Sequence, residues 1–235
     1  MSRDTVESVR LLIGMLLTVS GVVLGLLTSS AKERFDSYST DLSAFGADLI
    51  ELDARLRGYG AEADSIRKLL RAYTAAALAD TWPEEQPPPG QYPRFSQTPG
   101  RRNVESKALG NMLEAVDASI GHLSPDDAYH TQLAARLRDR SAQAIQQRWR
   151  LIFSVSATTS WPFLLVLTSW LAIIFAIFGL TAPPHRVIYV VVALSAISIV
   201  SPFYLIIDYS EAWTGLLQLS SEPLRTALWH MDQEN

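Results

Sequence analysis

The stretch TTSWPFLLVLTSWLAIIFAIFGLTAPP, residues 158–184, decides the fold class because no residue in it carries a charge. A bilayer core of about 30 Å is crossed by roughly 20 apolar helical residues at about 1.5 Å each. The stretch exceeds that length and lies in an uncharged run that extends over residues 151–185. It therefore predicts a membrane-embedded helix, which either anchors a polar domain or helps to build a path across the bilayer.

Two further segments are long and apolar enough to cross a bilayer, which makes three predicted spans. They are residues 11–30 and 187–207, beside residues 161–181 from the stretch above. Prolines in the short connection 182–186 predict that the last two spans form an antiparallel hairpin. The first segment also resembles a signal peptide cleaved near Ala31, but its long apolar run and its acidic flank favour an uncleaved span.

Composition narrows the class of protein. The 235 residues carry a net charge of −4 and include no cysteine. This balance gives no reason to expect a nucleic-acid partner. The lack of thiols excludes disulfides, thiolate catalysis and cysteine-ligated metals.

Basic residues near the spans predict the orientation of the chain. The positive-inside rule places the more basic side in the cytoplasm. One side carries Arg3, Arg10 and Arg186, and the other carries Lys32, Arg34, Arg136, Arg138, Arg140, Arg148, Arg150 and Arg225. The central region and the C-terminus are therefore predicted to be cytoplasmic, with the N-terminus outside.

The polar middle of the chain predicts a cytoplasmic bundle of helices. Apolar residues recur there every three or four positions, which is typical of amphipathic helices. Residues 83–103 are rich in proline and predict a mobile loop. A later helix is predicted to open with Ser124 as its N-cap. The clearest apolar set is Leu42, Phe45, Leu49, Leu52 and Leu56.

The predicted organisation has four parts. Residues 1–31 form the first transmembrane helix, and residues 32–150 form the cytoplasmic helical domain. Residues 151–208 form a membrane entry segment and the transmembrane hairpin. Residues 209–235 form an amphipathic cytoplasmic segment that either packs on the helical domain or lies at the membrane interface.

Candidate chemical sites are weak. His122 and His130 flank Asp126 and Asp127, a set that could ligate a metal, but the same residues suit the start of a helix. The motif GYG at residues 58–60 resembles a potassium filter, yet it follows an amphipathic helix and lacks an apolar pore helix. The histidines suit no Ser–His–Asp arrangement, and no glycine-rich phosphate loop occurs. The sequence therefore predicts no enzyme activity, no cofactor and no metal site.

Small and hydroxyl residues share one face of the first span and one face of the third. Such faces allow either close packing of helices or a narrow, polar-lined conduit, and both interpretations remain open. No Asp, Glu, Lys or Arg lies within a span, which disfavours a proton-coupled transporter or pump. The pore-lining or helix-packing candidates are Gly14, Thr18, Gly21, Gly25 and Ser29 in the first span, and Ser195 and Ser198 in the third.

Two further groups of candidates lie at the ends of the hairpin. Ser160, Trp161 and Pro162 are gate or hinge candidates, because Pro162 should interrupt a continuous helix and Trp161 suits an interfacial position. Asp208 and Glu211, after the third span, are candidates for a cytoplasmic vestibule.

Three separated motifs carry a family resemblance. They are SWPFLLVLTSWLAIIFAIFGLTAP, LRGYGAEADSIRKLLRAYTAAALADTWP and TGLLQLSSEPLRTAL. Together they resemble the DUF4239 family, bacterial membrane proteins described as bestrophin-like. The chain departs from that pattern in residues 208–213, DYSEAW, where a second acid and a proline of the family are missing.

The resemblance implies an all-α, bestrophin-like integral membrane protein in a bacterial inner (plasma) membrane. Because bestrophins are ring-shaped oligomeric anion channels, it also implies a homo-oligomeric ion channel, pentameric by analogy, with the lipid bilayer and inorganic ions as partners. No acidic run matches the calcium-binding segment of bestrophins, so calcium gating is not expected. The alternative is a membrane-anchored scaffold or signalling protein that acts through its cytoplasmic helices. For a channel, the first span is favoured as the pore-lining helix.

Overall fold

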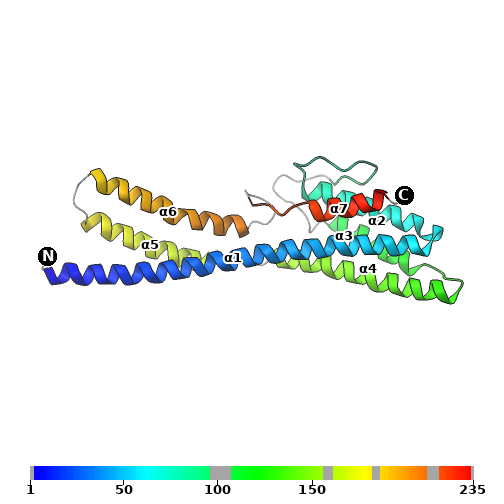
Figure 1. The fold of residues 1–235 in the computed structure, drawn as a ribbon, viewed down its shortest axis with the longest axis horizontal. Coiled ribbons are helices and arrows are strands. Elements are labelled where there is room, and N and C mark those ends of the chain that lie inside the picture. Colours follow the sequence, from blue (N-terminus) through cyan, green and yellow to red (C-terminus); the bar gives the residue numbers. More distant parts are fainter. Residues whose placement is uncertain (1–2, 96–106, 156–160, 182–185, 211–216, 234–235) are drawn as a thin grey trace. The chain divides into compact units, whose positions relative to one another are not determined.

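The computed structural model describes residues 3–95, 107–155, 161–181, 186–210 and 217–233. Every regular element in these ranges is a helix, which confirms the predicted all-α class (Figure 1). The elements are α1 (Arg3–Tyr59), a 3-10 turn η1 (Ala61–Ala63), α2 (Asp64–Thr81), α3 (Lys107–Gly121), α4 (Ala128–Val155), α5 (Trp161–Thr181), α6 (Arg186–Ser210) and α7 (Glu222–Gln233).

The helices belong to two compact units. Unit 1 comprises Met1–Asp36 and Ala157–Gln218, and unit 2 comprises Ser37–Ser156 and Leu219–Asn235. Helix α1 contributes to both units, because no proline interrupts it between the first span and the polar region.

Three of the described helices are long and apolar enough to cross a membrane, as the sequence predicted. They are the segment Leu11–Tyr59 of α1, Pro162–Gly179 of α5 and Arg186–Tyr209 of α6. In a bilayer a helix satisfies its backbone hydrogen bonds internally, so these elements suit the hydrocarbon core.

Unit 1 is built on apolar contacts between α1, α5 and α6. Leu167, Leu171 and Ile174 of α5 are buried against residues of α1 and α6, including Leu24 and Phe203. A second cluster joins Ala31, Leu164 and Ile206, one residue from each of the three helices. Large apolar side chains on the outer faces of these helices are exposed, as expected of surfaces that meet lipid.

Unit 2 is a helical bundle with α2 at its centre. Helix α2 packs on α3 and on α7, and α3 packs on α4. The predicted apolar stripe of α1 is buried, which confirms that this face turns into a core; its members are Leu42, Phe45, Leu49, Leu52 and Leu56. The C-terminal helix α7 buries its apolar face through Leu224, Ala227, Leu228 and Met231.

Helix α4 begins later than the sequence predicted. Its cap is Asp127, whose carboxylate accepts a hydrogen bond of 2.7 Å from the backbone N–H of His130. The carbonyl of Asp127 also accepts the N–H of Thr131 at 2.9 Å. The predicted cap at Ser124 was therefore wrong. A carboxylate so placed also complements the positive end of the helix dipole, which a serine hydroxyl does not do by charge.

Candidate functional site

The small-residue face of α1 is exposed along the whole of the predicted first span. Its five members, Gly14, Thr18, Gly21, Gly25 and Ser29, are all exposed. A Cβ atom added at any of the three glycines would meet nothing within 4 Å. Contacts with α5 and α6 come from the other side of α1, so within the chain this face packs on nothing that the structure describes.

Two threonine hydroxyls in the span donate to the backbone of their own helix. Thr18 Oγ1 donates to the carbonyl of Gly14 at 2.9 Å, and Thr28 Oγ1 donates to the carbonyl of Leu24 at 2.8 Å. A hydroxyl that donates its proton in this way still offers its oxygen as an acceptor. Through Thr18 the small face of α1 can therefore present an oxygen atom to a partner helix or to permeating water and ions.

The small face continues beyond the membrane segment as a polar face. Steps of three or four residues lead from Ser29 to Lys32 and Asp36, and a further two turns lead to Ser43 and then Ala47, all of them exposed. Lys32 and Asp36 form an ion pair between adjacent turns. Small and polar side chains therefore follow one side of α1 well past the membrane segment.

The candidates on α6 form a separate exposed surface. Ser195 and Ser198 are exposed, whereas Ile199, Phe203 and Ile206 of the same helix contribute to the core of unit 1. The structure thus places small-residue faces on two helices, and both are available to partners from outside the chain.

The hinge candidates lie where α5 begins. Helix α4 ends at Val155 and α5 begins at Trp161, so Pro162 stands in the first turn of a helix. A proline there costs no hydrogen bond, because the first backbone N–H groups of a helix have no partner within it. Ser160 lies outside the described residues, and a gate or hinge at this point remains a prediction.

Asp208 has a structural partner that sequence reasoning missed. It is only 6% exposed, and its carboxylate accepts the backbone N–H of Leu217 at 2.9 Å. A carboxylate near the C-terminal end of a helix is disfavoured by the helix dipole, so its presence there was a signal that a tertiary donor compensates. Glu211, the other vestibule candidate, lies outside the described residues.

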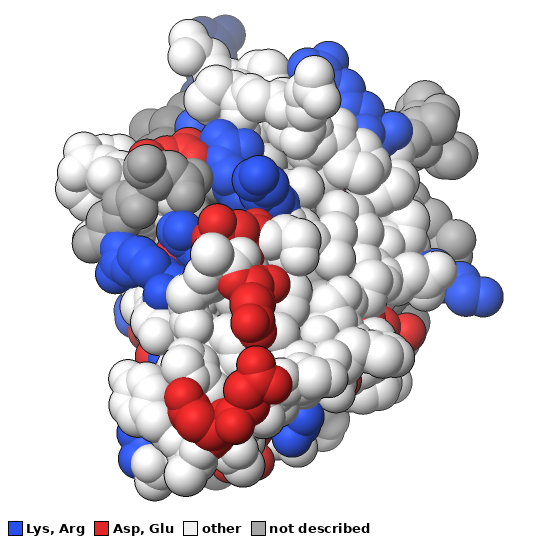
Figure 2. All heavy atoms as spheres, turned by 90° about the vertical axis from the view of Figure 1, so that its right-hand side faces the viewer, with Lys and Arg blue, Asp and Glu red and all other residues white. Residues whose placement is uncertain are grey.

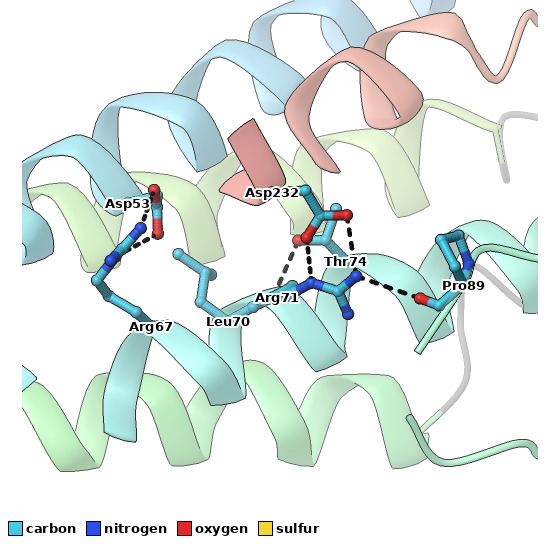
Figure 3. A network of polar contacts seen from close by, with 7 residues as sticks. All are labelled: Asp53, Arg67, Leu70, Arg71, Thr74, Pro89 and Asp232. Atoms are coloured by element: carbon cyan, nitrogen blue, oxygen red, sulfur yellow. Dashed lines mark hydrogen bonds and ion pairs between the residues drawn. The ribbon is translucent and has the colours of Figure 1, made fainter. Parts of the chain in front are cut away.

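Helix α2 is tied to its neighbours by ion pairs that the sequence did not reveal (Figure 3). Arg67 donates to both oxygens of the Asp53 carboxylate, at 3.0 and 3.2 Å, which joins α2 to α1. Arg71 pairs with Asp232 of α7 and donates to the carbonyl of Pro89 at 3.2 Å. The side chains of Arg67 and Asp53 are 11% and 6% exposed, so this pair is largely shielded from solvent.

The described part of the proline-rich loop, residues 83–95, is tied to the start of α7. Glu85 Oε2 accepts hydrogen bonds from Ser221 Oγ at 2.6 Å and from Arg225 Nη2 at 2.6 Å. Partial burial opposes ionisation of Glu85, but the hydrogen bonds from Ser221 and Arg225 prevail and lower its pKa. Nearby, Trp82 Nε1 donates to the carbonyl of Leu219 at 2.8 Å.

Acidic side chains gather in a row on the end-on face that Figure 2 shows, with basic groups beside them. At the start of α4, His130 Nδ1 lies 2.8 Å from Asp127 Oδ2. This hydrogen bond, with the charges of Asp127 and Glu62, raises the pKa of His130. Among the described residues, no group of three or more His, Cys, Asp or Glu side chains is placed to hold a metal ion.

These features define an all-helical membrane protein with three candidate spans and a polar helical bundle. A family profile described as the Bestrophin-like domain matches residues 1–224. The chain belongs to the bestrophin-like family.

Solved structures show the same fold. A crystal structure of a bacterial Bestrophin homolog from Klebsiella pneumoniae, a single-residue variant, aligns with a TM-score of 0.65 at 16% identity, over 93% of this chain and 86% of that one. A second variant of the homolog aligns with a TM-score of 0.66 at 16% identity, over 94% and 85% of the two chains. A crystal structure described as that of a membrane protein aligns with a TM-score of 0.63 at 17% identity, over the same shares. No curated protein matches the sequence.

Proposed function

We propose that the chain assembles as a homo-oligomeric channel of the DUF4239 branch that lets inorganic ions cross the bacterial inner membrane passively. The observation that carries this proposal is the exposed small face of α1, which no described part of the chain covers. The N-terminus would face outside and unit 2 the cytoplasm, in keeping with the basic residues that flank the spans. Subunit number is five by analogy with bestrophins.

Helix α1 presents surfaces of two different kinds to its surroundings. Met15, Val22 and Leu26 are exposed and large, as suits contact with lipid chains. The small face beside them carries glycine and hydroxyl groups, which suit a second helix or water better than lipid. In an oligomeric ring both surfaces have a use, with the large side chains turned to lipid and the small face turned to the axis and to neighbouring subunits.

The charge pattern of the spans supports passive conduction. Residues 11–30, 162–181 and 187–207 include no Asp, Glu, Lys or Arg. A pump or a proton-coupled transporter normally keeps an ionisable group at membrane depth. Hydroxyl and backbone oxygens can replace part of an ion's hydration shell without one.

Single-channel recording of purified protein in planar bilayers, with asymmetric KCl, tests the proposal. Gly21→Leu and Gly25→Leu should reduce the unitary conductance, because the new side chains would fill the small face. Both positions are exposed and a Cβ added at either meets no described atom within 4 Å, so both variants should fold. Val22→Leu is the matched control, since Val22 belongs to the large apolar surface.

The outcomes separate channel from scaffold. Discrete currents that fall in the glycine variants but not in Val22→Leu would support a pore along α1, and the reversal potential would give its charge preference. Silence from protein that gel filtration shows to be assembled would refute the channel. The alternative, a membrane-anchored scaffold that acts through unit 2, would then stand.

A further inference from the structure

Two exposed aromatic side chains stand one turn apart near the end of α4. Trp149 is 44% exposed and Phe153 is 68% exposed. Their rings stack with centroids 5.6 Å apart and an interplanar angle of 22°. Exposed aromatic pairs are unusual on a surface that meets only water, because each ring can bury a large apolar area.

The backbone under this pair is well packed, so the exposure does not arise from a loose helix end. Leu151 and Ile152, which lie between the two aromatic residues, are 2% and 6% exposed. Arg148 is also buried and lies beside Tyr73. The last turns of α4 therefore have one face in the core of unit 2 and another face that is open.

The position in the chain indicates what meets the open face. Arg150, which is exposed and follows Trp149 in the sequence, is the last charged residue before the uncharged run 151–185. The span of α5 begins at Pro162, nine residues after Phe153. Nine residues reach roughly 14 Å as helix and at most about 32 Å when extended, so the chain keeps Phe153 within about 32 Å of the start of that span.

We propose that Trp149, Arg150 and Phe153, called the α4 patch, bind the phospholipid interface of the cytoplasmic leaflet. The two rings would lie at the boundary between headgroups and acyl chains, where amphipathic aromatic side chains accumulate. The guanidinium of Arg150 would bind a phosphate oxygen of an anionic lipid, since its charge and geometry are complementary to phosphate. This inference holds whether the protein is a channel or a scaffold, because it requires only the spans.

The chain contains no cysteine, so a single introduced thiol can be labelled without removing others. Phe153→Cys and Ala142→Cys would each carry a nitroxide spin label in full-length protein, reconstituted in vesicles of phosphatidylcholine and phosphatidylglycerol. Ala142 is exposed on α4, eleven residues before Phe153. Eleven residues are about three turns and about 16 Å, so the control label shares the face of α4 and differs in depth.

The measurement compares how often the spin label collides with oxygen, which concentrates in lipid, and with a water-soluble nickel chelate. The ratio of oxygen to nickel accessibility should be severalfold higher at position 153 than at position 142. A similar, water-like ratio at both positions would overturn the proposal. So would a label at 153 that is shielded from both reagents and broadened by spin–spin coupling, because a second copy of the chain would then cover the patch.

The phosphate contact has its own test in the labelled Phe153→Cys protein. Adding Arg150→Gln, or omitting phosphatidylglycerol, should lower the ratio of oxygen to nickel accessibility at position 153. An unchanged ratio in both cases would refute the role of Arg150. Circular dichroism and gel filtration confirm folding, which Phe153→Cys should preserve because the side chain it removes is mostly exposed.

Discussion

Replacing Gly46 with alanine should destabilise unit 2, because α1 and the start of α7 approach each other too closely there for a side chain. A Cβ atom on Gly46 would lie 2.8 Å from the carbonyl oxygen of Pro223 and 3.1 Å from its carbonyl carbon and its Cβ. Ordinary contacts are several tenths of an ångström longer. The obstacle is mostly backbone, so it has no flexible end that can swing away.

The size of the effect follows from two opposing contributions. Overfilling a packed site typically costs about 1–3 kcal/mol. Alanine in place of glycine within a helix contributes about 1 kcal/mol of stability. Gly58→Ala is the matched control, because Gly58 is also in α1 and an added Cβ would meet nothing within 4 Å. The helix contribution is similar in both variants, so Gly46→Ala should be less stable than Gly58→Ala by about 1–3 kcal/mol.

Thermal unfolding of both variants, followed by far-ultraviolet circular dichroism in detergent, measures this difference. A chain of this size shifts its Tm by about 2–4 °C per kcal/mol, which gives a separation of roughly 2–12 °C. Equal midpoints, or a higher midpoint for Gly46→Ala, would refute the close approach of α1 to Pro223.

Three further predictions concern polar contacts in unit 2. Asp53→Asn should cost about 3 kcal/mol, measured as a lower thermal midpoint, because it leaves the shielded guanidinium of Arg67 without its anion; an unchanged midpoint would contradict this. His130 should titrate by NMR above its ordinary pKa and return toward it in Asp127→Asn, and its stabilising contribution should be complete below the unfolded pKa and lost as pH rises through the folded one. For Glu85 the sign is opposite, since its lowered pKa gives a contribution that is lost as pH falls through the folded value; Glu85→Gln should therefore flatten the acid limb of the unfolding profile.

Sequence periodicity was sufficient for the fold class and the spans. Uncharged runs of sufficient length predict membrane helices directly. Burial of charge in hydrocarbon is costly, and the length of a spanning helix must match the bilayer thickness. The stripe from Leu42 to Leu56 likewise reports a buried face, since helix geometry brings every third or fourth residue to one side. Both signals are local, and both were correct.

The candidate site could be predicted only in part. Sequence spacing found the small face of α1, because a shared face is also a local property. It did not reveal that α5 and α6 leave this face uncovered. Asp208 was predicted as a vestibule residue, and only the structure shows that its carboxylate accepts the backbone N–H of Leu217. The N-cap of α4 was predicted wrongly because the side chains of Ser124 and Asp127 can both cap a helix. Only the backbone geometry in the structure shows that Asp127 is the cap.

The sequence by itself determined that this protein has three membrane helices and a polar helical domain. The tertiary structure alone decided which polar groups pair, which glycine is needed for close approach, and which helix faces remain open. Arg71 and Asp232 are 161 positions apart, and Glu85 and Arg225 are 140 apart. Such pairs depend on how helices pack against one another and not on the residue pattern within any one helix. The local periodicity of the sequence therefore does not predict them.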